Sequence, residues 1–165
     1  MSTHLKHLAA AALASASLVV HADTLSVSES TTLAAPAAQV WQAIGHFGDL
    51  NWHPAVKRTE ITRGTEGQAG ALRTITLQND ATLVEEALAQ GDDAIIYRIL
   101  ESPLPVRNYV SRLKIEPLGK HSRVTWSSQF EAKAGVGAAQ ARRTIAGIYT
   151  GGFEALKKRF GGAMR

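Results

Sequence analysis

The chain has 165 residues, a formal net charge of +4 and no cysteine. Its length accommodates one domain with a single hydrophobic core, and the absence of cysteine excludes a disulfide framework and thiolate chemistry. Basic residues gather at the end of the chain, where seven basic residues and one acidic residue occur from Lys133 onward. Such a face either contacts acidic lipid or an acidic partner, or is a solvated helix surface whose cations stabilise the C-terminal dipole. The alternation of basic and aromatic residues typical of nucleic-acid binding is absent, so we expect no nucleic-acid partner.

Residues 1–22 have the features of an export signal. Lys6 precedes an apolar run over residues 8–20, and small or branched residues occupy the positions before Asp23. The run is too short for a stable membrane anchor. We therefore expect a signal peptide at residues 1–22, one domain at residues 23–165, a periplasmic or secreted location and no stable membrane insertion. The alternative is an N-terminal core helix.

The remaining chain predicts a mixture of strands and helices. Alternating apolar residues predict a strand at 24–33, and a short helix then begins at Pro36, with Val40, Trp41 and Ile44 on its buried face. Residues 46–54 predict a second short helix or a tight loop. Six more strands follow, and the short turns between them favour antiparallel pairing. These strands are expected at residues 55–63, 71–78, 81–90, 94–100, 106–117 and 122–133.

The last segment, residues 137–160, is a long stretch with clear helical periodicity. Its apolar residues recur at three- and four-residue steps and form one stripe along the helix. Gly147, Gly151 and Gly152 each cost about 1 kcal/mol relative to alanine in a helix interior. Either close packing of the helix on a strand or space for a ligand would offset that cost. The elements together predict an α+β, helix-grip fold: a curved antiparallel sheet of about seven strands around a long C-terminal helix, with two short helices after the first strand.

A set of short motifs runs through the chain in the same order as these elements. They are Val40-Trp41-Gln42-Ala43-Ile44, Phe47-Gly48-Asp49, Trp52-His53-Pro54, Gly70-Ala71-Leu72-Arg73, Glu86-Ala87-Leu88, Tyr97, Leu104-Pro105, Tyr109 and Val124-Thr125-Trp126. These motifs resemble the polyketide cyclase/dehydrase and lipid-transport family, which belongs to the START-like (Bet v 1-like, SRPBCC) superfamily. The resemblance covers nearly all of residues 24–160 and implies a cavity between the sheet and the long helix. It specifies the fold better than the function, because the superfamily includes lipid carriers, hormone receptors and cyclases.

Strand alternation predicts which side chains face such a cavity. In each of three predicted strands, one face is more apolar than the other and should point inward. The residues on these faces are Ile95, Tyr97 and Ile99; Tyr109, Ser111, Leu113 and Ile115; and Val124, Trp126, Ser128 and Phe130. Any one of these side chains either contacts a ligand or fills a core. The expected ligand-binding residues are Lys57, Arg73, Glu86, Tyr97, Leu104, Tyr109, Ser111, Trp126, Ile145 and Tyr149.

A predicted hairpin centred on Asn79-Asp80 places charged residues on the apolar face of its strands. A two-residue turn there would pair Arg73 with Glu86. A lone buried charge is costly, so the two form a structural ion pair or give a polar anchor to a ligand. A slip of one residue in the register would separate them.

Two of these positions also resemble ligand contacts in plant hormone receptors of the superfamily. Lys57 matches a lysine that meets a ligand carboxylate, and Glu86 matches a pocket glutamate. An exposed strand lysine is the simpler interpretation of Lys57. With Arg73, Tyr109 and Ser111, these residues would suit an amphipathic ligand that has one acidic or hydroxylated end.

The loop at residues 102–106 contains two prolines one residue apart, which stiffen it. It resembles loops that border the cavity mouth in the superfamily. We expect it to form an entrance rim together with residues 52–54. The alternative is an ordinary rigid turn.

Signals for a metal or cofactor are missing. His46, His53 and His121 have no second ligand at metal spacing, and each is expected at the surface or in a capping position. Nucleophile-elbow, phosphate-loop and dinucleotide motifs are also missing. We therefore assign no cofactor, no metal and no catalytic residue.

The sequence thus favours an exported protein that holds a hydrophobic or amphipathic small molecule, lipid or polyketide-like, and that is a binding protein rather than an enzyme. One alternative is a polyketide cyclase or dehydratase-like enzyme that uses Glu86 and Tyr109. Another is a periplasmic accessory protein that acts through a protein partner, similar to exported family members linked to methanol oxidation.

Overall fold

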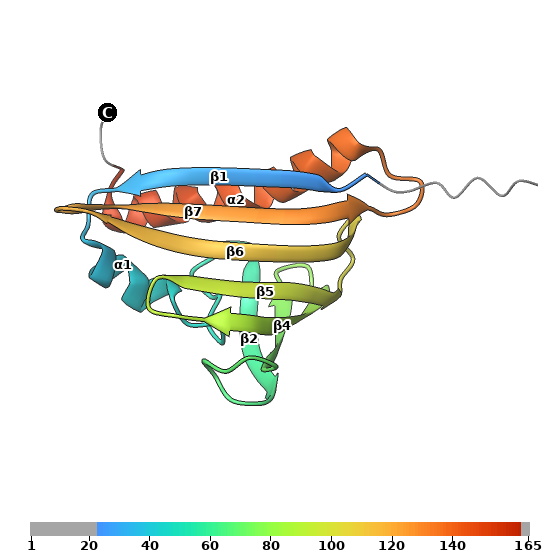
Figure 1. Cartoon of the computed structure of the whole chain (residues 1–165), viewed down its shortest axis with the longest axis horizontal. Coiled ribbons are helices and arrows are strands. Elements are labelled where there is room, and N and C mark those ends of the chain that lie inside the picture. Colours follow the sequence, from blue (N-terminus) through green and yellow to red (C-terminus); the bar gives the residue numbers. More distant parts are fainter. Residues whose placement is uncertain (1–22, 163–165) are drawn as a thin grey trace, which may run out of the picture.

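A computed structural model describes residues 23–162, and the expected signal peptide lies outside this range. Seven strands form one antiparallel sheet in the order β1-β7-β6-β5-β4-β3-β2. The long helix α2 lies along one face of this sheet, next to β1 and β7 (Figure 1). The predicted α+β helix-grip fold is therefore confirmed. The elements are β1 (Leu25–Leu33), α1 (Ala37–Ile44), β2 (Val56–Arg63), β3 (Leu72–Leu77), β4 (Thr82–Gln90), β5 (Ala94–Glu101), β6 (Val106–Leu118), β7 (His121–Ala132) and α2 (Ala138–Phe160).

The expectation of a second short helix after β1 is wrong. Residues 46–55 form a series of turns, closed by backbone hydrogen bonds from Asp49 to His46, from His53 to Leu50 and from Val56 to His53. Each bond spans three residues and none continues into a helix, because glycine and proline in this segment disfavour helical propagation. The turns carry Phe47, Leu50 and His53 into the interior.

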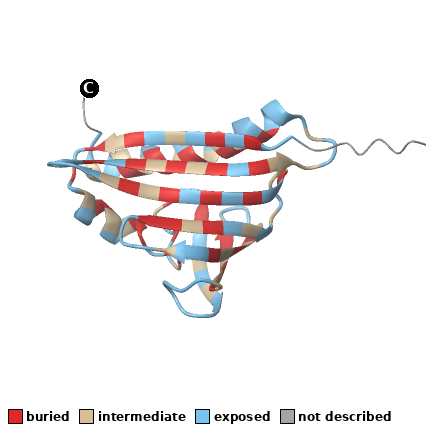
Figure 2. Ribbon diagram, in the orientation of Figure 1, coloured by how far each residue is buried: buried red, intermediate tan, exposed pale blue. Residues whose placement is uncertain are grey.

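The inward faces of β5, β6 and β7 agree with the predicted alternation. Buried and exposed residues alternate along these strands in Figure 2. Ile99, near the end of β5, is half-buried rather than buried. The other predicted inward residues are all buried: Ile95, Tyr97, Tyr109, Ser111, Leu113, Ile115, Val124, Trp126, Ser128 and Phe130.

The glycines of α2 have different surroundings. A Cβ atom on Gly152 would lie 2.8 Å from His53 Cδ2 and 3.2 Å from the Trp52 ring. Close packing therefore explains Gly152, although the packing partner is the 46–55 segment rather than a strand. Nothing lies within 4 Å of a Cβ atom on Gly147 or Gly151, so close packing does not explain these two.

The β3–β4 hairpin differs by one residue from the predicted register. Arg73 pairs with Glu85, not with Glu86. The cause is the loop, which has three residues instead of two: Leu77 and Ala81 close it, and Asp80 adopts a left-handed conformation with φ 63°. Three-residue hairpin loops commonly end in such a residue, and aspartate tolerates it. Because side chains alternate between faces, the shift turns Glu85 inward and Glu86 outward.

Candidate functional site

A cavity of about 210 Å³ lies between α2 and the inner face of the sheet. Strands β2 to β7, the 46–55 segment, the β5–β6 loop and α2 all contribute to its walls. These walls are mainly apolar and aromatic. The lining residues are Leu50, His53, Ala55, Val56, Ile75, Leu77, Leu83, Glu85, Tyr97, Ile99, Leu104, Tyr109, Trp126, Thr144, Ile145, Ile148 and Tyr149.

Six of the ten expected site residues belong to this lining. Ser111 lies one layer behind it, where its hydroxyl bonds to two lining side chains. Lys57, Arg73 and Glu86 are not among the lining residues. The six that line the cavity are Tyr97, Leu104, Tyr109, Trp126, Ile145 and Tyr149.

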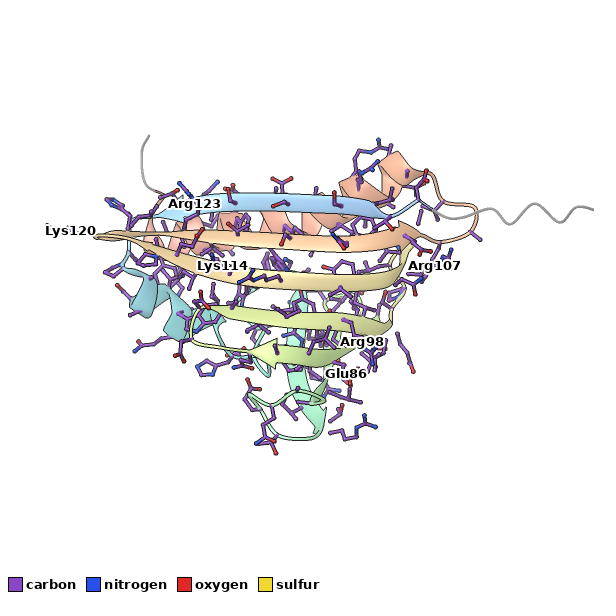
Figure 3. The ribbon with its side chains drawn as sticks, viewed as in Figure 1. Glu86, Arg98, Arg107, Lys114, Lys120 and Arg123 are labelled. Atoms are coloured by element: carbon purple, nitrogen blue, oxygen red, sulfur yellow. The ribbon has the colours of Figure 1, made fainter. Side chains whose placement is uncertain are left out.

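Lys57 and Glu86 do not face the cavity, so the expectation that they contact a ligand there is wrong. Lys57 lies at the protein surface, where its ammonium group forms an ion pair of 2.6 Å with Asp80. Glu86 lies on the face of the sheet away from α2 and pairs with Arg98 at 2.6 Å (Figure 3). Glu86 is outward because of the three-residue hairpin loop, which the sequence motif did not reveal.

Arg73 is buried, and each of its three guanidinium nitrogens contacts a protein oxygen. Its Nε donates to Glu85 Oε2 at 2.7 Å, another guanidinium nitrogen lies 2.6 Å from the same oxygen, and a third donates to the Phe47 carbonyl at 2.6 Å. The guanidinium also lies 4.3 Å from the Phe47 ring centroid and 4.9 Å from that of Tyr97, within the range of cation–π attraction. Arg73 is therefore a structural cation behind the cavity wall.

Glu85 is the inward acid that sequence reasoning missed. Its side chain is 6% exposed and lines the cavity. Burial raises the pKa of the Glu85 carboxyl, while the adjacent Arg73 guanidinium opposes that rise. With Nε donating to Oε2 and a second guanidinium nitrogen 2.6 Å from the same oxygen, the pair is best described as carboxylate and guanidinium. The sequence indicates an inward acid at this point of the hairpin, but a two-residue loop would make it Glu86. The three-residue loop makes it Glu85.

A polar network supports the aromatic wall on β5, β6 and β7. Trp126 Nε1 donates to the Tyr97 hydroxyl at 2.8 Å and to Ser111 Oγ at 3.1 Å. Ser111 donates to the Ser127 carbonyl at 2.9 Å. The Tyr149 hydroxyl lies 3.3 Å from Ser111 Oγ and 2.5 Å from the Tyr109 hydroxyl. Burial raises the pKa of all three tyrosines, so their hydroxyls are neutral.

The number of protons fixes the direction of the hydroxyl hydrogen bonds in this network. Each hydroxyl carries a single proton. Ser111 directs its proton to Ser127, which leaves Tyr149 to donate to Ser111 and Tyr109 to donate to Tyr149. Tyr97 accepts from Trp126, and the Ser111 hydroxyl is a second polar neighbour of the Tyr97 hydroxyl.

His53 fastens the 46–55 segment to α2. Its Nε2 lies 2.8 Å from the Ile148 carbonyl, and the Ala55 backbone N–H donates to Nδ1 at 3.2 Å. This pattern requires a neutral ring with the proton on Nε2. Burial lowers the pKa of the His53 imidazole, and the bond to Ile148 opposes that shift. The expected surface position of His53 is therefore wrong, although its bond to Ala55 does cap a turn.

The partly exposed lining residues mark the mouth of the cavity. Thr144 and Ile148 of α2 lie on one side, and Leu77 and Ile99 of the sheet lie on the other. Leu104, from the proline-containing loop, is also half-buried and lines the cavity. This geometry agrees with the expected rim at residues 102–106. Ligand entry at this rim stays a prediction.

The described residues contain neither a metal cluster nor a membrane span. No group of three or more histidine, cysteine or acidic side chains is placed to hold a metal ion within residues 23–162. In the same range, no helix combines the length and the apolar composition needed to cross a bilayer.

A seven-stranded sheet that grips a long helix over a lined cavity defines the helix-grip class of proteins. A family model described as polyketide cyclase/dehydrase and lipid transport matches residues 24–161. The chain therefore belongs to this family, as its motifs suggested. Comparison with curated proteins gives no match.

Solved structures show the same fold. The chain is similar to the protein XoxI from Bacillus cereus, with 28% identity, a TM-score of 0.75 and coverage of 82% of this chain and 94% of that one. It is similar in fold to a START superfamily protein from Mycobacterium smegmatis, with 16% identity, a TM-score of 0.70 and coverage of 82% and 96%. Ara h 8.0201 is also similar in fold, with 17% identity, a TM-score of 0.65 and coverage of 83% and 97%.

Proposed function

We propose that this protein binds a compact, mainly apolar small molecule in the cavity between its sheet and α2. The lined cavity itself carries this proposal. Membership of a family whose description includes lipid transport also supports it. Binding would take place through burial of the ligand against the apolar walls, with a polar contact at one end.

The size of the cavity narrows the class of ligand. Pockets for drug-sized ligands usually measure about 300–1,000 Å³, and a dry cavity of about 150 Å³ holds benzene. The cavity of about 210 Å³ lies between these values. A ring compound, such as a small polyketide-like aromatic, therefore suits the cavity better than a lipid with a long acyl chain.

Native mass spectrometry of the purified protein tests this proposal. A bound small molecule should appear as a mass increment that disappears on denaturation. In Leu77→Trp, the larger side chain would occupy the mouth of the cavity, and the increment should be lost. Leu88→Trp is the matched control, because Leu88 is an exposed residue of β4 outside the lining. A mass increment that survives Leu77→Trp would contradict binding in this cavity.

We further propose that binding takes place after export, in the periplasm or outside the cell. The composition of residues 1–22 supports this proposal. N-terminal sequencing of the protein recovered outside the cytoplasm should give Asp23 as the first residue. Recovery of the mature protein with Met1 intact would contradict it.

The enzymatic alternative now depends on Glu85 instead of Glu86. A cyclase or dehydratase needs an acid or base in the cavity, and Glu85 is the carboxyl group that lines it. Two contacts from Arg73 to one oxygen favour a structural carboxylate over a proton carrier. A binding protein should show no turnover of a candidate polyketide, in wild type or in Glu85→Gln. Turnover that Glu85→Gln abolishes and Glu86→Gln preserves would establish the enzyme instead.

A further inference from the structure

The carboxylate of Glu85 has one engaged oxygen and one free oxygen. Both contacts from Arg73 go to Oε2, at 2.7 Å and 2.6 Å. Among residues 23–162, no side chain or backbone group donates a hydrogen bond to Oε1. Arg73 lies outside the cavity lining, and Glu85 belongs to it. A carboxylate has room for several acceptor bonds, so Oε1 is the oxygen left for a ligand.

Glu85 is also the only charged side chain in the lining. The other polar groups are already engaged: both ring nitrogens of His53 have partners, and the hydroxyls of Tyr109 and Tyr149 bond to each other. The Tyr97 hydroxyl has Trp126 and Ser111 as polar neighbours. Glu85 of β4 pairs with Ile99 of β5, two residues from Tyr97, so these two side chains are diagonal neighbours on one face.

We propose that the ligand presents a hydrogen-bond donor, namely a hydroxyl or amine group on an apolar ring, to Glu85 Oε1. A hydroxyl or amine in the cavity would donate to Oε1 and so satisfy this oxygen. This inference depends on the proposed function, because it names the polar end of the molecule that the cavity holds.

The same geometry argues against an acidic ligand. Neither of the two cations among the expected site residues is available to a ligand carboxylate, because Lys57 is at the surface and Arg73 is held by Glu85 and Phe47. A ligand carboxylate would instead meet the negative charge of Glu85 without a free cation nearby. Of the two polar ends expected from the sequence, the hydroxylated one fits and the acidic one does not.

Three compounds of similar size test this inference: p-cresol, p-xylene and p-toluic acid. They share a ring and differ in one substituent, and their binding to the purified protein can be followed by two-dimensional NMR titration. We expect p-cresol to bind at least about tenfold more tightly than p-xylene, because a hydrogen bond to a charged group is worth that much. We expect p-toluic acid to bind most weakly.

The outcomes separate the inference from the proposed function. Equal affinities for p-cresol and p-xylene would overturn the inference and leave the apolar cavity as a binding site. The tightest binding by p-toluic acid would overturn it as well. Failure of all three compounds to bind would overturn the proposed function, and the inference with it.

Variants identify the group that provides the selectivity. Glu85→Gln offers Arg73 an amide oxygen and turns an amide N–H₂ group toward the cavity, so the preference for p-cresol should disappear. Glu86→Gln is the matched control on the outer face and should keep the preference.

Because Glu85→Gln leaves the charge of Arg73 unbalanced, the double variant Arg73→Met with Glu85→Leu provides a second test. It should bind p-xylene and show no preference for p-cresol. A tenfold preference that persists in the double variant would overturn the role of Glu85.

Discussion

At the scale of single residues, Glu85 and Glu86 are identical side chains with opposite surroundings. Glu85 is buried against Arg73 and lines the cavity, whereas Glu86 pairs with Arg98 on the outer face. Neither residue type nor motif distinguishes them. The face of the strand decides whether the carboxylate takes part in the core or in a surface ion pair, and surface pairs contribute little to stability.

The Arg73–Glu85 pair should behave as a unit in unfolding experiments. Arg73→Met alone leaves a buried carboxylate unpaired, and we expect it to lower the free energy of unfolding by about 3–5 kcal/mol. The double variant Arg73→Met with Glu85→Leu should recover most of that loss, because apolar replacements of a buried pair are often neutral. Urea unfolding of the wild type, both single variants and the double variant measures the coupling. A double variant as unstable as the sum of the two single variants would contradict a direct pair.

His53 should make stability depend on pH. Because burial lowers the pKa of His53 in the folded state, the unfolded chain takes up its proton first as the pH falls through the usual value of 6.5. The free energy of unfolding should therefore fall from pH 6.5 toward the lowered folded pKa, with little contribution from His53 above pH 7. Urea unfolding between pH 5.0 and 7.5 (a range of about 2.5 units that includes the usual histidine pKa) tests this. His53→Gln should flatten the profile, and His121→Gln, at an exposed position, should leave it unchanged.

At the scale of elements, the sequence predicted the parts that depend on periodicity. The alternation along β6 and β7 and the apolar stripe of α2 each repeat over many residues, so one misread position does not alter the interpretation. The β3–β4 register depends instead on one loop. Asn79-Asp80 allows either a two-residue or a three-residue connection, and only the conformation of Asp80 decides between them. His53 was missed for a similar reason, because a loop segment has no repeat that reveals which side chain turns inward.

The glycines of α2 should differ in their response to alanine. Gly152→Ala would place a Cβ atom 2.8 Å from His53 Cδ2. We expect it to lower the free energy of unfolding by about 1–3 kcal/mol, as overpacking does. Gly147→Ala and Gly151→Ala meet nothing within 4 Å and should raise it by up to about 1 kcal/mol, through helix propensity. Urea unfolding of the three variants provides the comparison. Stabilisation by Gly152→Ala would show that the 46–55 segment does not pack against α2 in this way.

At the scale of the whole molecule, ligand binding and folding are linked. A ligand that occupies the cavity binds only the folded chain, because strands β2 to β7 and α2 must all be in place to enclose it. p-Cresol at about 100 times its Kd should therefore raise the free energy of unfolding by about 2.7 kcal/mol. Thermal unfolding with and without p-cresol measures this effect. Leu77→Trp should lose the shift and Leu88→Trp should keep it, and a shift of the same size in Leu77→Trp would contradict occupancy of the cavity.

The three-residue turn at residues 78–80 has a consequence for comparisons among members of the family. If a relative with the same number of residues between Arg73 and Glu85 forms a two-residue turn instead, the pairing shifts by one residue, and the second acid of the Glu85-Glu86 pair would become the interior one. Alignments that match acidic residues by type would then equate an interior group with a surface group. The interior acid of a relative is better identified by counting residues from the turn than by matching the acidic motif. Two proteins with the same acidic motif but different turn types should therefore bind different ligands.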